Sequence, residues 1–477
     1  MSKKVILNNT NIEIHDYHPG DCEELEKSLS VWNSSYYRWE PRGIEYDEEN
    51  YIIRIPRGIY VSFLKSKLKC PIETNTDYND YDKTNFKLRT EPRDDIQINS
   101  IAFLTGEVKF KYTKEYSQLS LNLDTGDGKT YCVIASLCLL KCKAIIITHT
   151  ENIKEQWLKS ISKFTSIDKR RICNLSGTKV LEDVYLEGSD AYDIFLVNHG
   201  TLKQYGKKYG WDKMNDLFKK LKVGIKVFDE AHIEFKSILK VDLHTNVYKT
   251  FYITATLART DVSEDRVYKL SFKNIAKFGY ETRGIKRKHI KYIAIKYNSK
   301  PTYEDQLSIK GPKGFNRNAY IDYEIDKGLI FEVIKYVMET FKDVEGKCLI
   351  LSSKINSSEI IADKVREWYP EKDLKVFHSK MSKADKEGYK DADIISTTPQ
   401  SCGTGFDCPG LRYNIMTEPY NAEITAQQVA GRLREIPDEY TYHIELIDIG
   451  FPKVRDMYKR RLKVFKEKCY SVSEVDY

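Results

Sequence analysis

The sequence predicts an α/β protein with two parallel-sheet domains in tandem, and three observations lead to this prediction. Short apolar runs rich in β-branched residues recur through most of the 477 residues. Segments with helical periodicity separate these runs. Hydrophobic residues make up 41% of the chain, which is enough to bury a sizeable core. At about 150 residues per domain the length corresponds to roughly three domains, so we expect one smaller unit beside the two sheet domains.

Each predicted sheet is indicated by a series of buried strands that alternate with helical segments, as in βαβ units. The first series comprises residues 144–148, 193–197, 225–228 and 251–253. The second series comprises residues 347–351, 374–377, 393–396, 412–416 and 441–447. We therefore expect one domain over residues 89–284 and another over residues 285–450.

The two ends of the chain differ from these domains. Residues 1–88 are interpreted as a small α+β unit, because strand-like runs flank a charged helical stretch near residues 22–29. The polar segment 75–85 has almost no aliphatic residues and is typical of a linker. After residue 450, the basic stretch 454–468 predicts a helix within a C-terminal extension, residues 451–477.

Composition argues against several classes of protein. No apolar run approaches the roughly 18 residues of a membrane span, and the apolar run near the N-terminus is too short for a secretory signal, so we expect a cytoplasmic protein without a membrane partner. Ten scattered cysteines without a Cys-x-x-Cys pair favour reduced thiols. The net charge, 77 − 70 = +7, is a weak indication of nucleic-acid binding.

Residues 121–130 are the most informative stretch. An apolar run leads through Asp124 and Thr125 into Gly126-Asp127-Gly128-Lys129-Thr130, and a helical segment follows. Glycines let backbone N–H groups surround a phosphate, the lysine meets the β- and γ-phosphates, and the threonine hydroxyl ligates Mg²⁺ at the helix N-terminus. We interpret the stretch as a nucleotide-binding loop, although Leu123 replaces the first glycine of the strict pattern. The alternative is an ordinary Gly-rich turn.

Two adjacent acids, Asp229 and Glu230, follow an apolar strand about a hundred residues later. An aspartate at the end of a strand can hold Mg²⁺, and the following glutamate can take a proton from an attacking water. A solvated acidic turn explains the pair equally well when it is considered alone. The nucleotide-binding loop upstream favours the catalytic interpretation.

Asp229-Glu230-Ala231-His232 resembles the signature of the DEAH-box branch of superfamily 2 helicases, and the other motifs of that family are present before and after it in the family's order. They are the Gln motif at 93–97, Ia at 147–150 with 156–157, Ib at 193–202, the Ser/Thr-Ala-Thr motif at 254–256, IV at 348–353, V at 396–398 with 403–407, and VI at 428–434. The resemblance covers about residues 90–450. It implies two RecA-like domains that bind ATP and Mg²⁺ between them.

The resemblance also implies roles for individual residues. Lys129 and Thr130 hold phosphates and Mg²⁺, Asp229 holds Mg²⁺, and Glu230 activates water. The other implied nucleotide contacts are Gln97, Thr125, Gly126, Asp127, Gly128, Gly405, Asp407, Gln428 and Arg432. Motif VI departs from the family pattern, because Glu435 stands where a second arginine is usual. Arg432 is the implied arginine finger. Whether Arg434 replaces the second arginine or is a surface residue stays open.

Nucleic-acid contacts are implied for short hydroxyls in the motif loops, namely Thr150, Thr201, Ser353 and Thr398. Two basic segments, 286–291 and 310–317, can bind a phosphate backbone, the second through Lys313 and Arg317. A solvated charged face explains both segments as well. The N-terminal unit mixes aromatics with arginines at Trp32, Tyr36, Tyr37, Arg38, Trp39 and Arg42. These aromatics either stack on bases or form the core of the unit.

The resemblance implies an ATP-dependent helicase or translocase. The form of the nucleotide-binding loop, the segment 55–58 and the basic segment 458–465 are most similar to viral helicases, both phage branch-migration helicases of the UvsW type and the poxvirus transcript-release helicase. Branched or replicating viral DNA is the first expected substrate. An RNA-directed or transcript-release ATPase is one alternative. A catalytically weak nucleic-acid-binding module, suggested by Asp127 and Glu435, is another. We expect a monomer, with replication, recombination or transcription proteins as possible partners.

Overall fold

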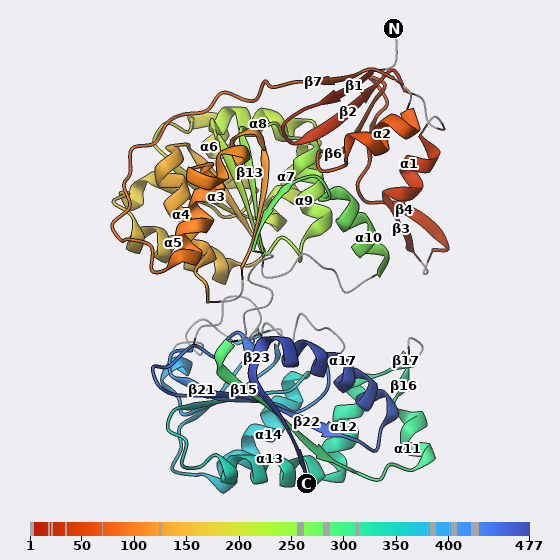
Figure 1. Cartoon of the computed structure of the whole chain (residues 1–477), viewed down its shortest axis with the longest axis vertical. Coiled ribbons are helices and arrows are strands. Elements are labelled where there is room, and N and C mark those ends of the chain that lie inside the picture. The colour runs from red at the N-terminus through yellow and green to blue at the C-terminus, as the bar shows by residue number, and fades with distance from the viewer. Residues whose placement is uncertain are drawn as a thin grey trace. The chain divides into compact units, whose positions relative to one another are not determined.

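The computed structural model contains two compact units, residues 1–281 and 282–477 (Figure 1). The structure describes residues 4–17, 20, 22–33, 36–68, 70–123, 126–254, 262–279, 287–311, 314–378, 380–381, 388–399, 401, 408–420 and 429–477. The predicted α/β class is confirmed, because each unit is built around a seven-stranded parallel sheet.

The N-terminal part of the first unit is a five-stranded sheet in the order β5-β6-β2-β1-β7. Its strands are β1 (Lys4–Leu7), β2 (Asn11–His15), β5 (Glu45–Asp47), β6 (Ile52–Pro56) and β7 (Ile72–Thr74). Helices α1 (Glu23–Ser28) and α2 (Val61–Leu68) accompany them. Neighbouring strands are antiparallel except β1 and β7. The expected mixture of strands and helices is therefore present, and it belongs to the first compact unit.

A separate hairpin in this region pairs β3 (Ser30–Asn33) with β4 (Arg38–Pro41). Trp32 lies directly opposite Trp39, and their ring centroids are 5.6 Å apart in an edge-to-face arrangement. The two side chains are 43% and 46% exposed, whereas Val31 on the other face is buried. The alternative in which both tryptophans form the core is wrong, because aliphatic residues of β1, β2 and β6 fill that core.

The large sheet of the first unit has the order β10-β11-β9-β12-β13-β8-β14, and every neighbouring pair is parallel. Its strands are β8 (Gln118–Asn122), β9 (Ala144–Thr148), β10 (Ile172–Leu175), β11 (Ile194–Asn198), β12 (Ile225–Asp229), β13 (Lys249–Thr254) and β14 (Ala276–Phe278). The accompanying α-helices are α3 (Asp95–Thr105), α4 (Lys129–Leu140), α5 (Glu151–Phe164), α6 (Thr178–Glu187), α7 (His199–Tyr209), α8 (Lys213–Leu221), α9 (Phe235–Leu243) and α10 (Val262–Ser271). The short 3₁₀ helices are η1 (Val108–Glu115) and η2 (Lys169–Arg171).

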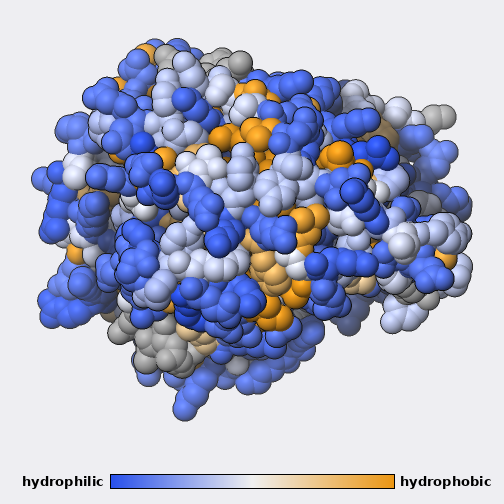
Figure 2. Space-filling model, turned by 90° about the horizontal axis from the view of Figure 1, so that it is seen from below, coloured by the Kyte–Doolittle hydropathy of each residue, from blue (hydrophilic) through white to orange (hydrophobic). Residues whose placement is uncertain are grey.

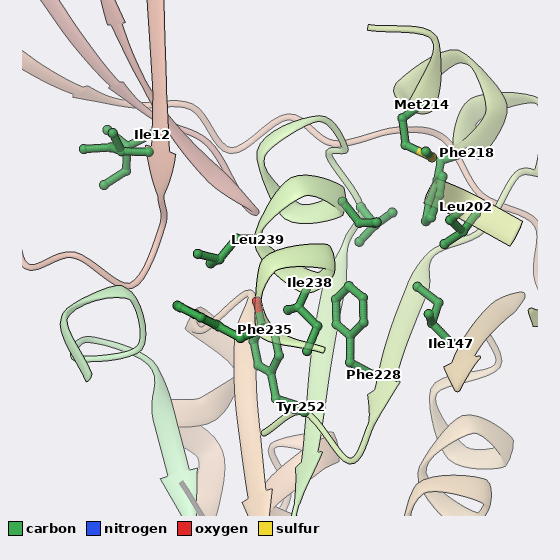
Figure 3. Packing of buried hydrophobic residues seen from close by; sticks show 14 of the residues in the cluster. Ile12, Ile147, Leu202, Met214, Phe218, Phe228, Phe235, Ile238, Leu239 and Tyr252 are labelled. Atoms are coloured by element: carbon green, nitrogen blue, oxygen red, sulfur yellow. The ribbon is translucent and has the colours of Figure 1, made fainter. Parts of the chain in front are cut away.

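Both faces of this sheet are buried, because successive strand residues point to opposite sides. On β9, Ile146 packs with α3, α4 and α5, while Ile145 and Ile147 pack with α6 to α10. The group of buried side chains that includes Ile145 and Ile147 also includes Ile12 and other residues of the N-terminal sheet. Figure 3 shows Ile12 of β2 together with Phe235 and Leu239 of α9. The small N-terminal sheet and the large sheet therefore share one core.

Polar contacts fix the turn between β1 and β2 against the loop that precedes β13. Asn11 Nδ2 donates to the Leu243 carbonyl at 2.7 Å, and Thr10 Oγ1 donates to the Thr245 carbonyl. The predicted linker 75–85 is bonded to the same loop, since Asn79 N donates to the Asn246 carbonyl at 2.9 Å. This polar segment has no aliphatic residues, but it is ordered and bonded to the rest of the first unit.

The sheet of the second unit has the order β19-β20-β18-β21-β22-β15-β23, with parallel neighbours throughout. Its strands are β15 (Arg287–Tyr297), β18 (Lys347–Leu351), β19 (Leu374–Phe377), β20 (Ile394–Thr397), β21 (Leu411–Met416), β22 (Thr441–Asp448) and β23 (Cys469–Asp476). Its helices are α11 (Tyr303–Ser308), α12 (Arg317–Lys327), α13 (Leu329–Thr340), α14 (Ile355–Trp368), η4 (Tyr389–Asp391) and α17 (Pro452–Lys468). Helices α12 and α17 pack on one face of this sheet, and α13 and α14 on the other.

Two basic segments have more regular structure than the sequence indicated. Residues 287–291, expected as a charged cluster between domains, begin β15, in which Ile290 and Tyr292 are fully buried. The segment 310–317 forms the short hairpin of β16 (Lys310–Gly311) and β17 (Gly314–Phe315) and then enters α12, while Lys313 lies outside the described residues. The predicted C-terminal basic helix is confirmed as α17, and β23 follows it as an unexpected edge strand.

The surface has the polarity expected from a mean hydropathy of −0.53. The face drawn in Figure 2 is mostly hydrophilic, and its hydrophobic residues form small groups. Among the helices that the structure describes, none combines the length and the apolar composition that crossing a membrane requires.

Candidate active site

The predicted phosphate loop connects β8 to α4 through two glycines in left-handed backbone conformations. Gly126 has φ 104° and Gly128 has φ 82°. Residues other than glycine adopt such backbone angles only with strain. A Cβ atom at Gly128 would also lie 2.3 Å from Gln97 Nε2. Lys129 and Thr130 form the first turn of α4, and Lys129 Nζ donates to the Leu123 carbonyl at 2.8 Å. Thr125 lies outside the described residues.

Gln97 lies against this loop near the beginning of α3. Asp94 caps the helix by accepting a hydrogen bond from Gln97 N at 2.9 Å. The Gln97 side chain bridges two backbones, because Nε2 donates to the Asp127 carbonyl at 3.3 Å and Oε1 accepts from Arg93 N at 2.8 Å. The structure therefore places Gln97, Asp127 and Gly128 together, as the sequence predicted.

Asp229 and Glu230 lie at the carboxyl end of β12, the edge of a parallel sheet where ligands commonly bind. Two neutral donors fix the Asp229 carboxylate: Trp157 Nε1 donates to Oδ2 at 2.7 Å, and Glu230 N donates to Oδ1 at 3.0 Å. Burial and the neighbouring Glu230 raise the pKa of Asp229 to about 6, while Trp157 and Lys129 act in the opposite direction. The positive charge of Lys129 thus favours the ionised form of Asp229.

The turn after Asp229 has an unusual backbone. Glu230 has φ 49°, a left-handed conformation that is uncommon for residues other than glycine and is often found at functional sites. Its Oε2 lies 3.3 Å from His232 Nδ1, and the same ring nitrogen lies 2.8 Å from Thr254 Oγ1. His232 therefore joins the acidic turn to the end of β13. Ala255 and Thr256, the rest of that predicted motif, lie outside the described residues.

A second charged cluster, which the sequence did not reveal, connects the residue before α9 to the loop after β9 and to helix α7. Glu234 Oε1 lies 3.1 Å from His149 Nδ1, and Glu234 Oε2 pairs with Lys203 Nζ at 2.6 Å. The hydrogen bond from His149, followed by the contact with Lys203, lowers the pKa of Glu234 to about 2. Thr150 caps α5 and is only partly buried, whereas Thr201 in α7 is 8% exposed.

The oxygen ligands in this site fit Mg²⁺. The cation prefers hard oxygen ligands and usually takes only one or two protein carboxylates, with water and phosphate completing its shell. Asp229 supplies a carboxylate that receives hydrogen bonds from neutral donors rather than from arginine, and Thr130 lies in the first turn of α4. Within the described residues no group of three or more His, Cys, Asp or Glu side chains forms a separate metal cluster.

In the second unit, the structure brings Ser353 and Arg317 close to a buried carboxylate. Ser353 N donates to Glu418 Oε1, and the Arg317 guanidinium stacks on the Tyr420 ring at 4.3 Å. Burial raises the pKa of Glu418 to about 7, although Ser353, Arg317 and Lys354 oppose that shift. Thr398 is 4% exposed and donates to Ser401 Oγ at 2.9 Å. Ser353 and Arg317 thus both act on Glu418, whereas Thr398 makes its hydrogen bond within its own turn.

Arg432 and Arg434 lie in a turn that is anchored to the second sheet at both ends. Asn414 Nδ2 donates to the Val429 carbonyl at 3.3 Å, and His289 Nε2 lies 3.1 Å from the Leu433 carbonyl. Arg432 and Arg434 are partly buried, whereas Glu435 is exposed. Three predicted nucleotide contacts, Gly405, Asp407 and Gln428, lie outside the described residues.

A buried ion pair supports the same side of this sheet. Arg461 of α17 contacts both carboxylate oxygens of Glu445 on β22, with Nη2 at 2.9 Å from Oε2, and it donates through Nη1 to the Tyr420 carbonyl at 2.6 Å. Arg461 and Glu445 are both 1% exposed. The sequence indicated a basic helix at this position, but it did not reveal that one arginine of the helix is internal.

Comparisons with known proteins find similarity to part of the chain. A family model described as the res subunit of type III restriction enzymes matches residues 91–259. A protein of Enterocytozoon bieneusi (strain H348), described as the general transcription and DNA repair factor IIH helicase/translocase subunit XPB, is 25% identical over 182 residues. That alignment covers 34% of this chain and 29% of the XPB protein, so the chain spans less than a third of that relative.

Solved structures share the fold. S. cerevisiae Dbp5 bound to RNA and ADP BeF3 aligns with a TM-score of 0.56 and 13% identity, over 80% of this chain and 89% of that one. T4 UvsW aligns over the full length of both chains with 13% identity, but its TM-score of 0.39 supports no conclusion. The likeness to Dbp5 shows the fold alone, and the family model matches residues 91–259, which include the phosphate loop and the acidic turn.

Proposed function

We propose that the protein is an ATP-dependent DEAH-box helicase or translocase that acts on branched or replicating viral DNA. One observation carries the catalytic part of the proposal. Asp229 and Glu230 lie at the carboxyl end of β12, and Lys129 at the start of α4 is close enough to influence the pKa of Asp229. This combination of a cation at a phosphate loop with two acids suits phosphoryl transfer to water.

The proposed roles follow from the chemistry of each side chain. Lys129 binds the terminal phosphates of ATP, and Glu230 takes the proton of the attacking water on its carboxylate. Thr130 and Asp229 hold Mg²⁺, which when bound neutralises phosphate charge. Arg432 acts as the arginine finger. ATP binding is thus assigned to residues 89–284, and the finger to residues 285–450.

DNA is the preferred substrate because of the sequence relative. The XPB protein is described as a helicase/translocase subunit of a general transcription and DNA repair factor. It resembles this chain in amino-acid sequence, with 25% identity over 182 residues. An RNA-directed or transcript-release ATPase is the alternative, because Dbp5 binds RNA and shares the fold. The exposed Trp32 and Trp39 support nucleic-acid binding by the N-terminal unit, since sequence-tolerant binding of single strands uses aromatic stacking.

The viral role rests on the sequence resemblance alone. Monomeric action, a cytoplasmic location and contacts with replication, recombination or transcription proteins belong to the same proposal. Size-exclusion chromatography with light scattering checks the monomer, and a dimer at working concentration would contradict it.

ATP turnover measured with single-stranded DNA, forked DNA, four-way junctions, RNA and RNA–DNA hybrids tests the proposal. We expect forked or four-way DNA to stimulate turnover most and Lys129→Ala to abolish it. Stimulation by RNA alone would replace DNA with the RNA-directed alternative. Nucleic-acid binding without turnover in the unmodified protein would favour the catalytically weak module.

A further inference from the structure

Among the residues that the structure describes, the indole of Trp157 donates a side-chain hydrogen bond to Asp229. Trp157 lies near the middle of α5, is 1% exposed, and donates from Nε1 to Asp229 Oδ2 at 2.7 Å. Indole nitrogen is a donor only, so it cannot exchange roles with the carboxylate. A buried hydrogen bond to a charged group is among the stronger ones in proteins.

The geometry points to Trp157 as a positioning residue for the Mg²⁺ ligand: we propose that its indole fixes the rotation of the Asp229 carboxylate. Glu230 N holds Oδ1 and Trp157 holds Oδ2, so both oxygens are restrained. Each oxygen keeps a further lone pair for a cation or its water ligands. This inference rests on the proposed ATPase function, and it adds a residue to which the sequence motifs gave no role.

The indole is itself firmly held. Helix α5 begins at a Thr150 cap and buries Ile153, Trp157 and Ile161 along one face. These residues pack with Ile146 of β9 in the core of the first unit. A rigid donor costs little entropy when it orients its acceptor, which is what a support for a metal ligand requires.

Trp157→Phe is the appropriate change, because it keeps an aromatic ring in the core but removes the N–H group. Trp211→Phe is the matched control, since Trp211 packs near Gly206 and His244, away from the acidic turn. Loss of a partner that orients a metal ligand typically weakens metal affinity by about 10- to 100-fold. We expect the Mg²⁺ concentration for half-maximal ATP turnover to rise by about tenfold in Trp157→Phe and to stay unchanged in Trp211→Phe.

A binding measurement separates positioning from packing. Binding of a fluorescent ADP analogue is measured with EDTA and with saturating Mg²⁺, together with the thermal midpoint of each variant. We expect Trp157→Phe to keep the EDTA affinity and to lose most of the increase that Mg²⁺ produces. Equal weakening under both conditions, or a Mg²⁺ requirement within twofold of the unmodified protein, would overturn the inference. Absence of Mg²⁺-dependent binding and turnover in the unmodified protein would instead refute the proposed function.

Discussion

Strands β12 and β22 belong to two similar parallel sheets, but they use their carboxylates in opposite ways. Asp229 at the end of β12 receives hydrogen bonds from an indole and a backbone N–H, and its pKa is raised to about 6 by burial and by Glu230. Glu445 inside β22 is held by the Arg461 guanidinium, which lowers its pKa to about 2 against the effect of burial. A carboxylate held by neutral donors remains able to bind a cation, whereas one paired with arginine mainly supports the fold.

The largest effect is expected at the acidic turn of the first unit. Glu230→Gln removes the proposed proton acceptor, and the contribution of a general base is about 10²- to 10⁴-fold in rate. We expect kcat for ATP to fall by about that factor while ATP still binds. Steady-state kinetics and equilibrium nucleotide binding measure the two effects. Glu187→Gln, at the exposed end of α6, is the control and should behave as the unmodified protein.

The next largest effect distinguishes the two arginines of the second unit. Arg432→Ala should lower kcat by about 10³-fold, the lower end of the effect of an arginine finger. Arg434→Ala should change kcat by less than about tenfold if Arg434 is a surface residue. A comparable loss in both variants would show that Arg434 takes over the usual second position. Circular dichroism checks that each variant keeps the secondary structure of the unmodified protein, to whose sheet Asn414 and His289 anchor this turn.

The buried pair of β22 is expected to affect stability rather than turnover. Arg461→Ala leaves Glu445 buried without its cation, and breaking such a pair costs about 3–5 kcal/mol. We expect a loss of that size in urea unfolding of the second unit. The neighbouring Arg460 is exposed on the same helix, so Arg460→Ala should cost less than about 0.5 kcal/mol. Similar values for both variants would contradict the assigned role of the pair.

The smallest effect concerns a third kind of carboxylate, Glu324 of α12, which is fully buried and accepts from Tyr297 OH at 2.9 Å. Burial, then the neighbouring Asp448, raises the pKa of Glu324 well above its ordinary value. A raised folded-state pKa gives stability that is complete below the unfolded pKa and is lost as pH rises toward the folded pKa. Glu324→Gln, which is neutral at every pH, should therefore flatten the pH dependence of unfolding above about pH 5.

Thermal unfolding between pH 5 and pH 9 measures this last effect. Glu332→Gln, at an exposed position of α13, is the control and should keep the slope of the unmodified protein. An unchanged slope in Glu324→Gln would mean that Glu324 is ionised in the folded protein.

Much of the fold could be predicted from local pattern. Continuous apolar runs such as 144–148 and 347–351 correspond to β9 and β18 residue for residue, because a strand buried on both faces needs no alternation. Strand β15 was missed because Arg287, Lys288 and Lys291 make its beginning look like a solvated cluster. In the structure Ile290 and Tyr292 are buried, while Lys291 lies over the Tyr440 ring at 3.7 Å.

The site was predictable where chemistry follows from residue type and short spacing. Lys129, Thr130, Asp229 and Glu230 could be named as candidates because their motifs are local. The hydrogen bond between Trp157 and Asp229 joins residues 72 positions apart, and the pair of Glu234 with His149 spans a similar distance. Such contacts depend on which strands become neighbours, and that information is not present in any short segment.

The attachment of the turn between β1 and β2 has a practical consequence for shortened versions of the chain. A cut near residue 88 follows the change in sequence character, but it removes Ile12, Ile14 and their neighbours from a core that they share with α9 and α10. The aliphatic and aromatic side chains of those helices would then face water, and exposed apolar patches of that kind promote aggregation. A soluble fragment that retains the phosphate loop and the acidic turn should therefore begin at the first residue and end near residue 281.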